Sequence, residues 1–303
     1  MLRVPHRGTV ALACEVVMNT PGTRSNTAGW VLGAPSASTV DRSVPDSVSA
    51  VDLSTYCLML GDDALVLSAR LSEWGVRGSD LATDIALATI ALDLLRQARI
   101  LLERAGELEG AGRDENRLAH FRDAAHFRNV RLAEVDCGPG RSGDFAATVA
   151  RLLVMSTWRA AVFERLARTR DPVLSDQASR SIATLTAHRD HAGRWAASLG
   201  RRGTEERAAL ADGLERIWPL VGELFSPHPV ELSLAEADCA VDPAAVRSDV
   251  VAHLDTVLAE ARVDRPDPAV FTTFTPPGGR EGAHTGSMEF LLAEMQYLAR
   301  SAR

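Results

Sequence analysis

Several residue types are absent or scarce in this sequence, and each absence narrows the kind of protein it can encode. Lysine does not occur, so arginine supplies the positive charge. The planar guanidinium of arginine favours fixed ion pairs and bidentate hydrogen bonds to phosphate, whereas lysine is a mobile point charge. Tyrosine occurs twice and phenylalanine eight times in 303 residues, whereas alanine and leucine dominate. Together with 46% hydrophobic and 24% charged residues, this is the balance of a soluble α-helical protein.

Cysteine is also scarce, with four residues that lie far apart: Cys14, Cys57, Cys137 and Cys239. No Cys-x-x-Cys spacing occurs, so the sequence indicates neither a structural zinc site nor a thioredoxin-type redox pair. We interpret the four as small buried or free thiols in a reducing cytoplasm.

Long apolar runs are missing as well. No stretch of about 18 apolar residues occurs, which predicts no transmembrane helix and no membrane partner. The first 18 residues are an unlikely signal peptide because Glu15 interrupts their apolar run early. The formal net charge of -7 argues against nucleic acid as a partner, since phosphate contacts need clustered cations.

The chain divides into two parts by composition. Residues 19–49 are mostly Thr, Ser, Gly, Pro and Asn, which cannot bury enough surface to offset the entropy of ordering. We therefore predict a disordered extension over residues 1–50 and a helical domain over residues 51–303. A start codon assigned too far upstream is the alternative interpretation of the first part.

The second part has helical periodicity throughout. Leu60, Ala64, Leu67, Leu71 and Trp74 form one face of a first helix. A second helix around residues 85–105 is apolar on nearly all sides, which predicts a central, buried position. Further helices are expected to start at Asp144, after Asp171-Pro172, at Thr204 with a kink at Pro219, after Asp242-Pro243 and at Ser287. The fold class is all-α, a four-helix bundle with additional C-terminal helices.

Bundles of this kind often hold two metal ions, but here the ligand positions have been emptied. In di-iron carboxylate bundles, two helices each supply a Glu and two others each supply a Glu-x-x-His pair. The second helix offers Asp93-Leu94-Leu95-Arg96 at that place, with a cation where a ligand is needed. The fourth offers His188-Arg189-Asp190-His191, with no carboxylate three residues before either His. We predict no metal ligands and no catalytic residues in this chain.

Instead of metals, the sequence predicts a polar network formed by Asp93, Arg96, His188 and His191. A buried Asp93 needs a partner, which Arg96, Arg99 or a His of the fourth helix could provide. Glu73 and Glu164 are further candidate members, although a surface position is equally compatible. Two His at a spacing of three could also bind a transition metal, but Thr184 stands where a supporting carboxylate would help.

Eight segments of the chain carry a resemblance to a known family. They are residues 60–67, 71–74, 84–99, 170–172, 223–225, 240–243, 282–285 and 292–298. In this order they resemble the C subunit of phenylacetyl-CoA epoxidases, and they extend across residues 53–303. Two departures are the first 50 residues, which have no counterpart, and Thr184, where an acidic residue is expected.

The resemblance implies a ferritin-like subunit in the cytoplasm that binds no metal and no cofactor itself. It implies pairing with the di-iron A subunit of a multicomponent oxygenase, which epoxidises the ring of phenylacetyl-CoA with oxygen and electrons from a reductase. The C subunit would support the A subunit structurally. Two alternatives from other classes remain, namely an independent di-metal oxygenase or oxidase and a ferritin-like bundle that binds metal.

Two segments are candidates for contact with acyl-CoA at or near the shared interface. His126, Phe127, Arg128 and Asn129 combine a ring, a guanidinium and an amide, which could meet adenine and phosphates. Leu232, Ser233 and Leu234 match a second such stretch of the family and could contribute backbone groups to the contact. The alternative is that the first segment is a solvated arginine face and the second a structural turn.

Overall fold

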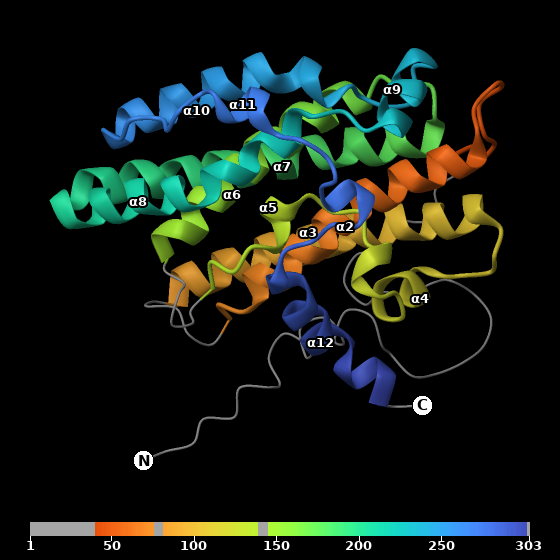
Figure 1. The fold of residues 1–303 in the computed structure, drawn as a ribbon, viewed down its shortest axis with the longest axis horizontal. Coiled ribbons are helices and arrows are strands. Elements are labelled where there is room, and N and C mark those ends of the chain that lie inside the picture. The colour runs from red at the N-terminus through yellow and green to blue at the C-terminus, as the bar shows by residue number, and fades with distance from the viewer. Residues whose placement is uncertain (1–39, 76–80, 139–144, 302–303) are drawn as a thin grey trace.

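The computed structural model describes residues 40–75, 81–138 and 145–301, and every regular element in these ranges is helical. Four long helices form an all-α, ferritin-like bundle (Figure 1): α2 (Ala50–Ser72), α3 (Leu81–Glu109), α6 (Phe145–Leu166) and α7 (Pro172–Arg202). Helix α2 packs mainly on α3 and α6 mainly on α7, so the bundle consists of two helix pairs.

Shorter elements connect and flank the bundle. They are α4 (Glu115–His120), η1 (Ala124–His126), α5 (Arg131–Glu134), α8 (Thr204–Ile217), η2 (Trp218–Phe225), α9 (Pro229–Glu236), η3 (Pro243–Val246), α10 (Arg247–Ala261), α11 (Val270–Thr273), η4 (Gly279–Glu281) and α12 (Gly286–Ser301). The predicted C-terminal helices are therefore present, and α12 projects from the lower side of the bundle in Figure 1.

Helix starts follow their capping residues. Asp171 caps α7 through a 2.8 Å hydrogen bond from the backbone N–H of Leu174, and Pro172 occupies the first helical position, as predicted. Buried hydroxyls then hold α2 against α3: Ser54 donates to the carbonyl of Ala105 at 2.8 Å, and Ser68 to that of Ala91 at 2.7 Å. These bonds satisfy polar groups inside an otherwise apolar contact.

Three sequence predictions need correction or refinement. The stripe through Pro219 is not one kinked α-helix, because α8 ends at Ile217 and residues 218–225 continue as a 3₁₀ helix. Proline lacks the N–H that an α-helical interior requires. Helix α3 is central but not buried on all sides, since Leu81 and Ile85 are exposed. Helix α6 is long and apolar enough to cross a membrane, although no such helix was expected; 89% of its apolar window is buried inside the fold.

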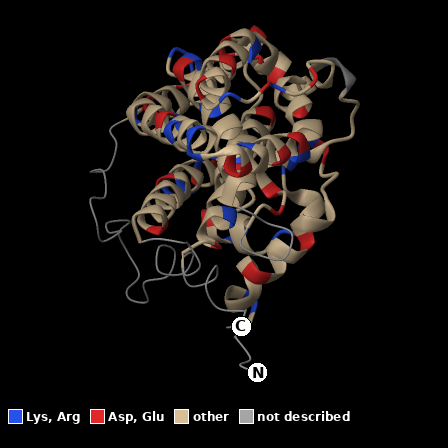
Figure 2. Ribbon diagram, turned by 90° about the vertical axis from the view of Figure 1, so that its left-hand side faces the viewer, with Lys and Arg blue, Asp and Glu red and all other residues tan. Residues whose placement is uncertain are grey.

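The expected extension over residues 1–50 lies mostly outside the described residues, because the first 39 are not described. Its last part is described: Val44 and Val48 pack against the core, and the carbonyl of Arg42 accepts a 2.8 Å hydrogen bond from Arg104. Cys57, Cys137 and Cys239 are buried. Acidic and basic residues are interspersed along the helices (Figure 2).

Candidate functional site

The interior of the bundle holds the guanidinium of Arg159, a residue of α6 that is almost completely buried. Its Nε donates to Oε1 of Gln97 on α3 at 3.1 Å, and its Nη1 donates to the carbonyl of Leu60 on α2 at 3.2 Å. The ring of Phe163, one turn further along α6, lies 4.5 Å from the guanidinium carbon. One side chain thus links three of the four bundle helices.

This guanidinium places a permanent positive charge in the bundle interior. Burial lowers the pKa of Arg159 to about 10, a change opposed by the nearby carboxylate of Asp63, so the group remains a cation at neutral pH. A cation and a neutral amide cannot replace the bridging carboxylates of a di-iron centre. Within the three described ranges, no three His, Cys, Asp or Glu side chains are grouped as metal ligands. The donor set of these residues does not fit two metal ions.

The predicted polar network is found in part. Asp93 accepts a 2.9 Å hydrogen bond from Arg96, and its other carboxylate oxygen lies 3.2 Å from Nε2 of His188 on α7. The side chain of His188 is 6% exposed, that of Asp93 22% and that of Arg96 55%. The network therefore joins α3 to α7 at the edge of the bundle rather than in its interior, where Arg159 lies.

The other candidate members have different surroundings. His191 packs edge-to-face on Trp195, with ring centroids 4.1 Å apart, and burial lowers its pKa. Glu73 pairs with Arg70 at 2.6 Å, and burial raises the pKa of Glu73. Glu164 is exposed. His191 is nevertheless near enough to His188 for the charge of His188 to contribute to the lowering of its pKa.

Two adjacent acids on α2, Asp62 and Asp63, anchor segments that are distant in sequence. Asp62 forms a buried ion pair with Arg122 and accepts a 2.8 Å hydrogen bond from the backbone N–H of Arg128. Asp63 pairs with Arg280 at 2.9 Å and accepts from the N–H of Val130 at 2.8 Å. Burial raises the pKa of Asp63, and the charge of Arg280 opposes this. The only sequence signal for these residues was two acids inside an apolar helical stripe.

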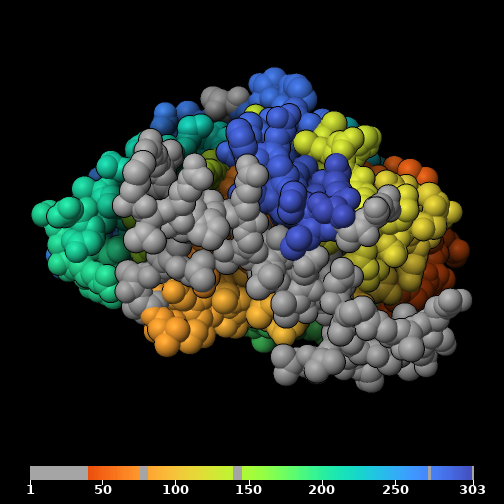
Figure 3. All heavy atoms as spheres, turned by 90° about the horizontal axis from the view of Figure 1, so that it is seen from below, coloured from red at the N-terminus to blue at the C-terminus, as the bar shows by residue number. Residues whose placement is uncertain are grey.

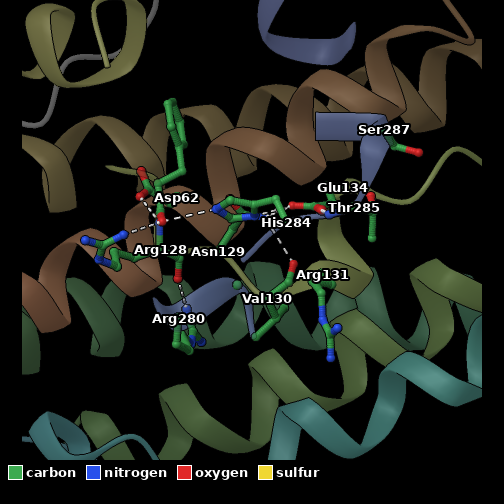
Figure 4. Close-up of polar contacts among 12 residues, drawn as sticks. Asp62, Arg128, Asn129, Val130, Arg131, Glu134, Arg280, His284, Thr285 and Ser287 are labelled. Atoms are coloured by element: carbon green, nitrogen blue, oxygen red, sulfur yellow. Dashed lines mark hydrogen bonds and ion pairs between the residues drawn. The ribbon is translucent and has the colours of Figure 1, made fainter. Parts of the chain in front are cut away.

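These bonds determine where the first acyl-CoA candidate segment lies (Figure 4). Phe127 and Asn129 are fully buried, which corrects the expectation that they face a ligand. Asn129 donates to Glu134 at 2.8 Å, and the ring of Phe127 lies 4.1 Å from the guanidinium carbon of Arg122. His126 is exposed, and Arg128 is half-buried with its Nη1 donating to two carbonyls of its own loop.

The second candidate segment lies on α9. Leu232 and Ser233 are exposed, whereas the side chain of Leu234 is buried in the core. The helical period explains the difference, because position 234 lies on the inner face of α9 and its two predecessors on the outer face.

Glu134 on α5 is the centre of the most highly connected buried cluster (Figure 4). It accepts hydrogen bonds from Asn129, from the N–H of Thr285 at 2.5 Å and from Nδ1 of His284 at 2.7 Å. The other ring nitrogen of His284 lies 3.2 Å from the carbonyl of Phe127. Burial alone would lower the pKa of His284, but the hydrogen bond and charge of Glu134 raise it. Both ring nitrogens face acceptors, an arrangement that favours the protonated form of His284.

The residues around this cluster fasten a connecting segment, the strap, which comprises residues 278–285 and leads into α12. Glu223 accepts a 2.6 Å hydrogen bond from the N–H of Gly279, and Arg280 donates to the carbonyls of Met59 and Arg128. The Gly-rich run of the strap is thus a structural element that lies against α2 and α5, and it sets the position of α12.

Comparison with known proteins gives two matches. Residues 38–303 match the family model described as phenylacetic acid catabolic protein. The chain is also 37% identical over 248 residues to the C subunit of 1,2-phenylacetyl-CoA epoxidase from Escherichia coli (strain K12). The aligned region covers 82% of this chain and 96% of that relative. The chain belongs to the family of phenylacetic acid catabolic proteins.

Proposed function

We propose that this chain is the structural, non-catalytic subunit of a phenylacetyl-CoA epoxidase and pairs with a di-iron subunit in the cytoplasm. The observation that carries the proposal is the 37% identity to the C subunit of such an epoxidase over 96% of the length of that relative. The assignment of the metal to the partner rests on the residues of the bundle interior.

The residues of the bundle interior favour a structural role for this chain. The guanidinium of Arg159 and the amide of Gln97 bond to each other between the helices, where a di-iron subunit needs carboxylates. The buried acids Asp63 and Glu134 already have charged partners, Arg280 and His284. These pairs stabilise the fold by anchoring the strap, so neither acid is available as a metal ligand.

Acyl-CoA contact is a second part of the proposal. Of the seven candidate residues, His126, Arg128, Leu232 and Ser233 keep accessible atoms. We assign these four, and not their buried neighbours, to the contact with the acyl-CoA held mainly by the di-iron subunit. Replacing His126 and Arg128 with alanine should weaken acyl-CoA binding by the complex and leave complex formation unchanged, as measured by isothermal titration calorimetry.

Metal analysis of the purified proteins tests the main proposal. The chain is expressed alone and together with its di-iron partner, and iron is quantified by mass spectrometry in each product. We expect negligible iron in the chain alone and about two irons per partner subunit in the complex. About two irons on the chain alone, with oxygen-dependent turnover, would establish an independent oxygenase; iron uptake without turnover would establish a metal-binding bundle.

A further inference from the structure

Helix α12 lies outside the four-helix bundle, on the face of the molecule seen from below (Figure 3, dark blue). It packs on α2, α4, α5 and η1. One face of the helix is buried, through Met288, Leu291, Leu292, Met295 and Gln296. The pairs α2–α3 and α6–α7 pack on each other directly, so α12 is appended to a core that forms without it. Such an element can open locally while the core stays folded.

The strap, residues 278–285, has one charged anchor in its middle and another at its end. Arg280 anchors the middle by donating to a carboxylate and to two carbonyls. Glu134 on α5 anchors the end, where it accepts from Nδ1 of His284 at 2.7 Å and from the N–H of Thr285 (Figure 4). The second anchor is the one next to α12, so it determines whether that helix stays docked.

Gly282 lies between the two anchors, with a φ of +81°. This left-handed conformation favours glycine, which also changes its backbone angles more freely than other residues. The chain that follows can therefore turn about Gly282 while Arg280 stays bonded. The part that would turn, the arm, is defined as residues 283–301 and comprises the end of the strap and α12.

The two charged anchors differ in their response to pH. The guanidinium of Arg280 keeps its charge, whereas the imidazole of His284 can lose its proton near neutral pH. Burial alone would lower the pKa of His284, but Glu134 on α5 and, to a smaller extent, Asp62 on α2 raise it. The net direction is upward, so the protonated form persists above pH 6.5.

A neutral imidazole cannot satisfy both of its neighbours. One ring nitrogen of His284 would then present a lone pair to an acceptor, either the carboxylate of Glu134 at 2.7 Å or the carbonyl of Phe127 at 3.2 Å. The side chain of Glu134 is 0% exposed, and it would also lose the positive charge beside it. A buried carboxylate without a counter-charge is destabilising, and opening of the arm would let water reach it.

Other charged groups near the arm do not respond in this way. Arg70 on α2 donates to the carbonyl of Ser287 at 3.0 Å and keeps its charge. His228 lies near the carboxylate of Glu281, but its Nδ1 accepts from the N–H of Val230 at 3.2 Å. Burial lowers the pKa of His228, so this ring is neutral at neutral pH. Its titration therefore does not hold or release the arm above pH 6.5.

We propose that His284 is a pH-dependent latch of the arm: protonated, it holds the arm on Glu134, and once deprotonated it lets the arm open while the four-helix bundle stays folded. Opening releases one proton, because His284 in the open arm is in water and has its ordinary pKa of 6.5. The apolar face of α12 still favours the docked state, so pH sets the population of open arms. The latch operates in this chain alone and does not rest on the proposed function.

Hydrogen–deuterium exchange of the full chain, followed by peptide mass spectrometry, tests the latch. The pH is raised in steps from 6.5, and exchange is corrected for the chemical rate of unstructured peptides. We expect the protection of the α12 amides to fall by up to about tenfold per pH unit until the folded pKa is reached, while α6 and α7 keep theirs. In His284→Gln, α12 should be weakly protected at every pH. His126→Gln, an exposed histidine of η1, is the matched control and should behave as wild type.

Three results would overturn the proposal. Protection of α12 that does not change with pH in the wild type would refute the latch, and a joint loss of protection in α12, α6 and α7 would refute a separately opening arm. A pH dependence that His284→Gln leaves unchanged would assign it to another group. Where that variant does not fold, exchange of the imidazole C2 hydrogen in the wild type gives the pKa of His284, and a value at or below 6.5 would refute the latch.

Discussion

The pair between Asp63 and Arg280 should contribute more to stability than any exposed ion pair of the molecule. Arg280 is 5% exposed and donates to Asp63 at 2.9 Å, to the carbonyl of Met59 at 3.0 Å and to that of Arg128 at 2.7 Å. In Arg280→Met the side chain keeps most of its length, but Asp63 loses its counter-charge and two carbonyls lose a donor. Breaking a buried pair in this way costs about 3–5 kcal/mol.

Urea unfolding followed by circular dichroism at pH 7 measures this loss. Arg165→Met is the matched control, because its 2.7 Å pair with Asp249 is exposed and such pairs contribute at most about 1 kcal/mol. Adding Asp63→Asn to Arg280→Met should restore part of the lost free energy, since the uncompensated carboxylate becomes a neutral amide that still accepts from Val130. A double variant no more stable than Arg280→Met alone would refute the reasoning that unpaired charge causes the loss.

Three further predictions follow from other contacts. Arg159→Met should lower the free energy of unfolding by about 1–3 kcal/mol, because Gln97 and the carbonyl of Leu60 lose a buried donor and Asp63 loses a nearby positive charge; unchanged or increased stability in thermal melting would contradict this. The pKa of His284 is raised above its ordinary value of 6.5, so its stabilisation is complete below that pH and is lost as pH rises through the folded pKa. The stability difference between wild type and His284→Gln should therefore shrink as the pH rises above 6.5, and a constant difference would show that the protonated imidazole does not contribute. In Gly279→Ala the new Cβ would lie 1.9 Å from the carbonyl oxygen of Asn129, which should lower the free energy of unfolding by more than about 2 kcal/mol. In Gly286→Ala the new Cβ meets nothing within 4 Å, so this control should be nearly neutral in the same denaturation assay.

The parts of the fold that could be predicted from the sequence are those set by local chemistry. Asp171-Pro172 predicts the start of α7 because a side-chain cap and a fixed φ act within one helical turn. The periodic leucines of α2 and α3 predicted two helices because apolar residues at helical spacing line up on one face within a few turns. The change from α8 to a 3₁₀ helix was missed because the periodicity of Leu210, Leu214 and Ile217 continues past the proline.

The site could be predicted only in part because its partners are far apart in sequence. Asp93 and Arg96 are three residues apart, so spacing made Arg96 one of the candidate partners, together with Arg99 and a His of the fourth helix. Asp63 and Arg280 are separated by 217 residues, so no local pattern pairs them. The chemistry of Phe127 and Asn129 suggested a ligand surface. In the structure, Asn129 donates to Glu134 and the ring of Phe127 packs on Arg122, so both side chains lie in the core. Residue type alone does not distinguish a binding group from a buried structural one.

The guanidinium of Arg159 also bears on any attempt to design a metal site into this bundle. A carboxylate introduced next to it would pair with the fixed interior cation, and the same cation would repel the metal that the carboxylate should attract. Removing Arg159 alone would leave Gln97, a neutral amide, and Asp63, which already pairs with Arg280. Several substitutions would therefore have to be made together before the interior of this bundle could hold iron.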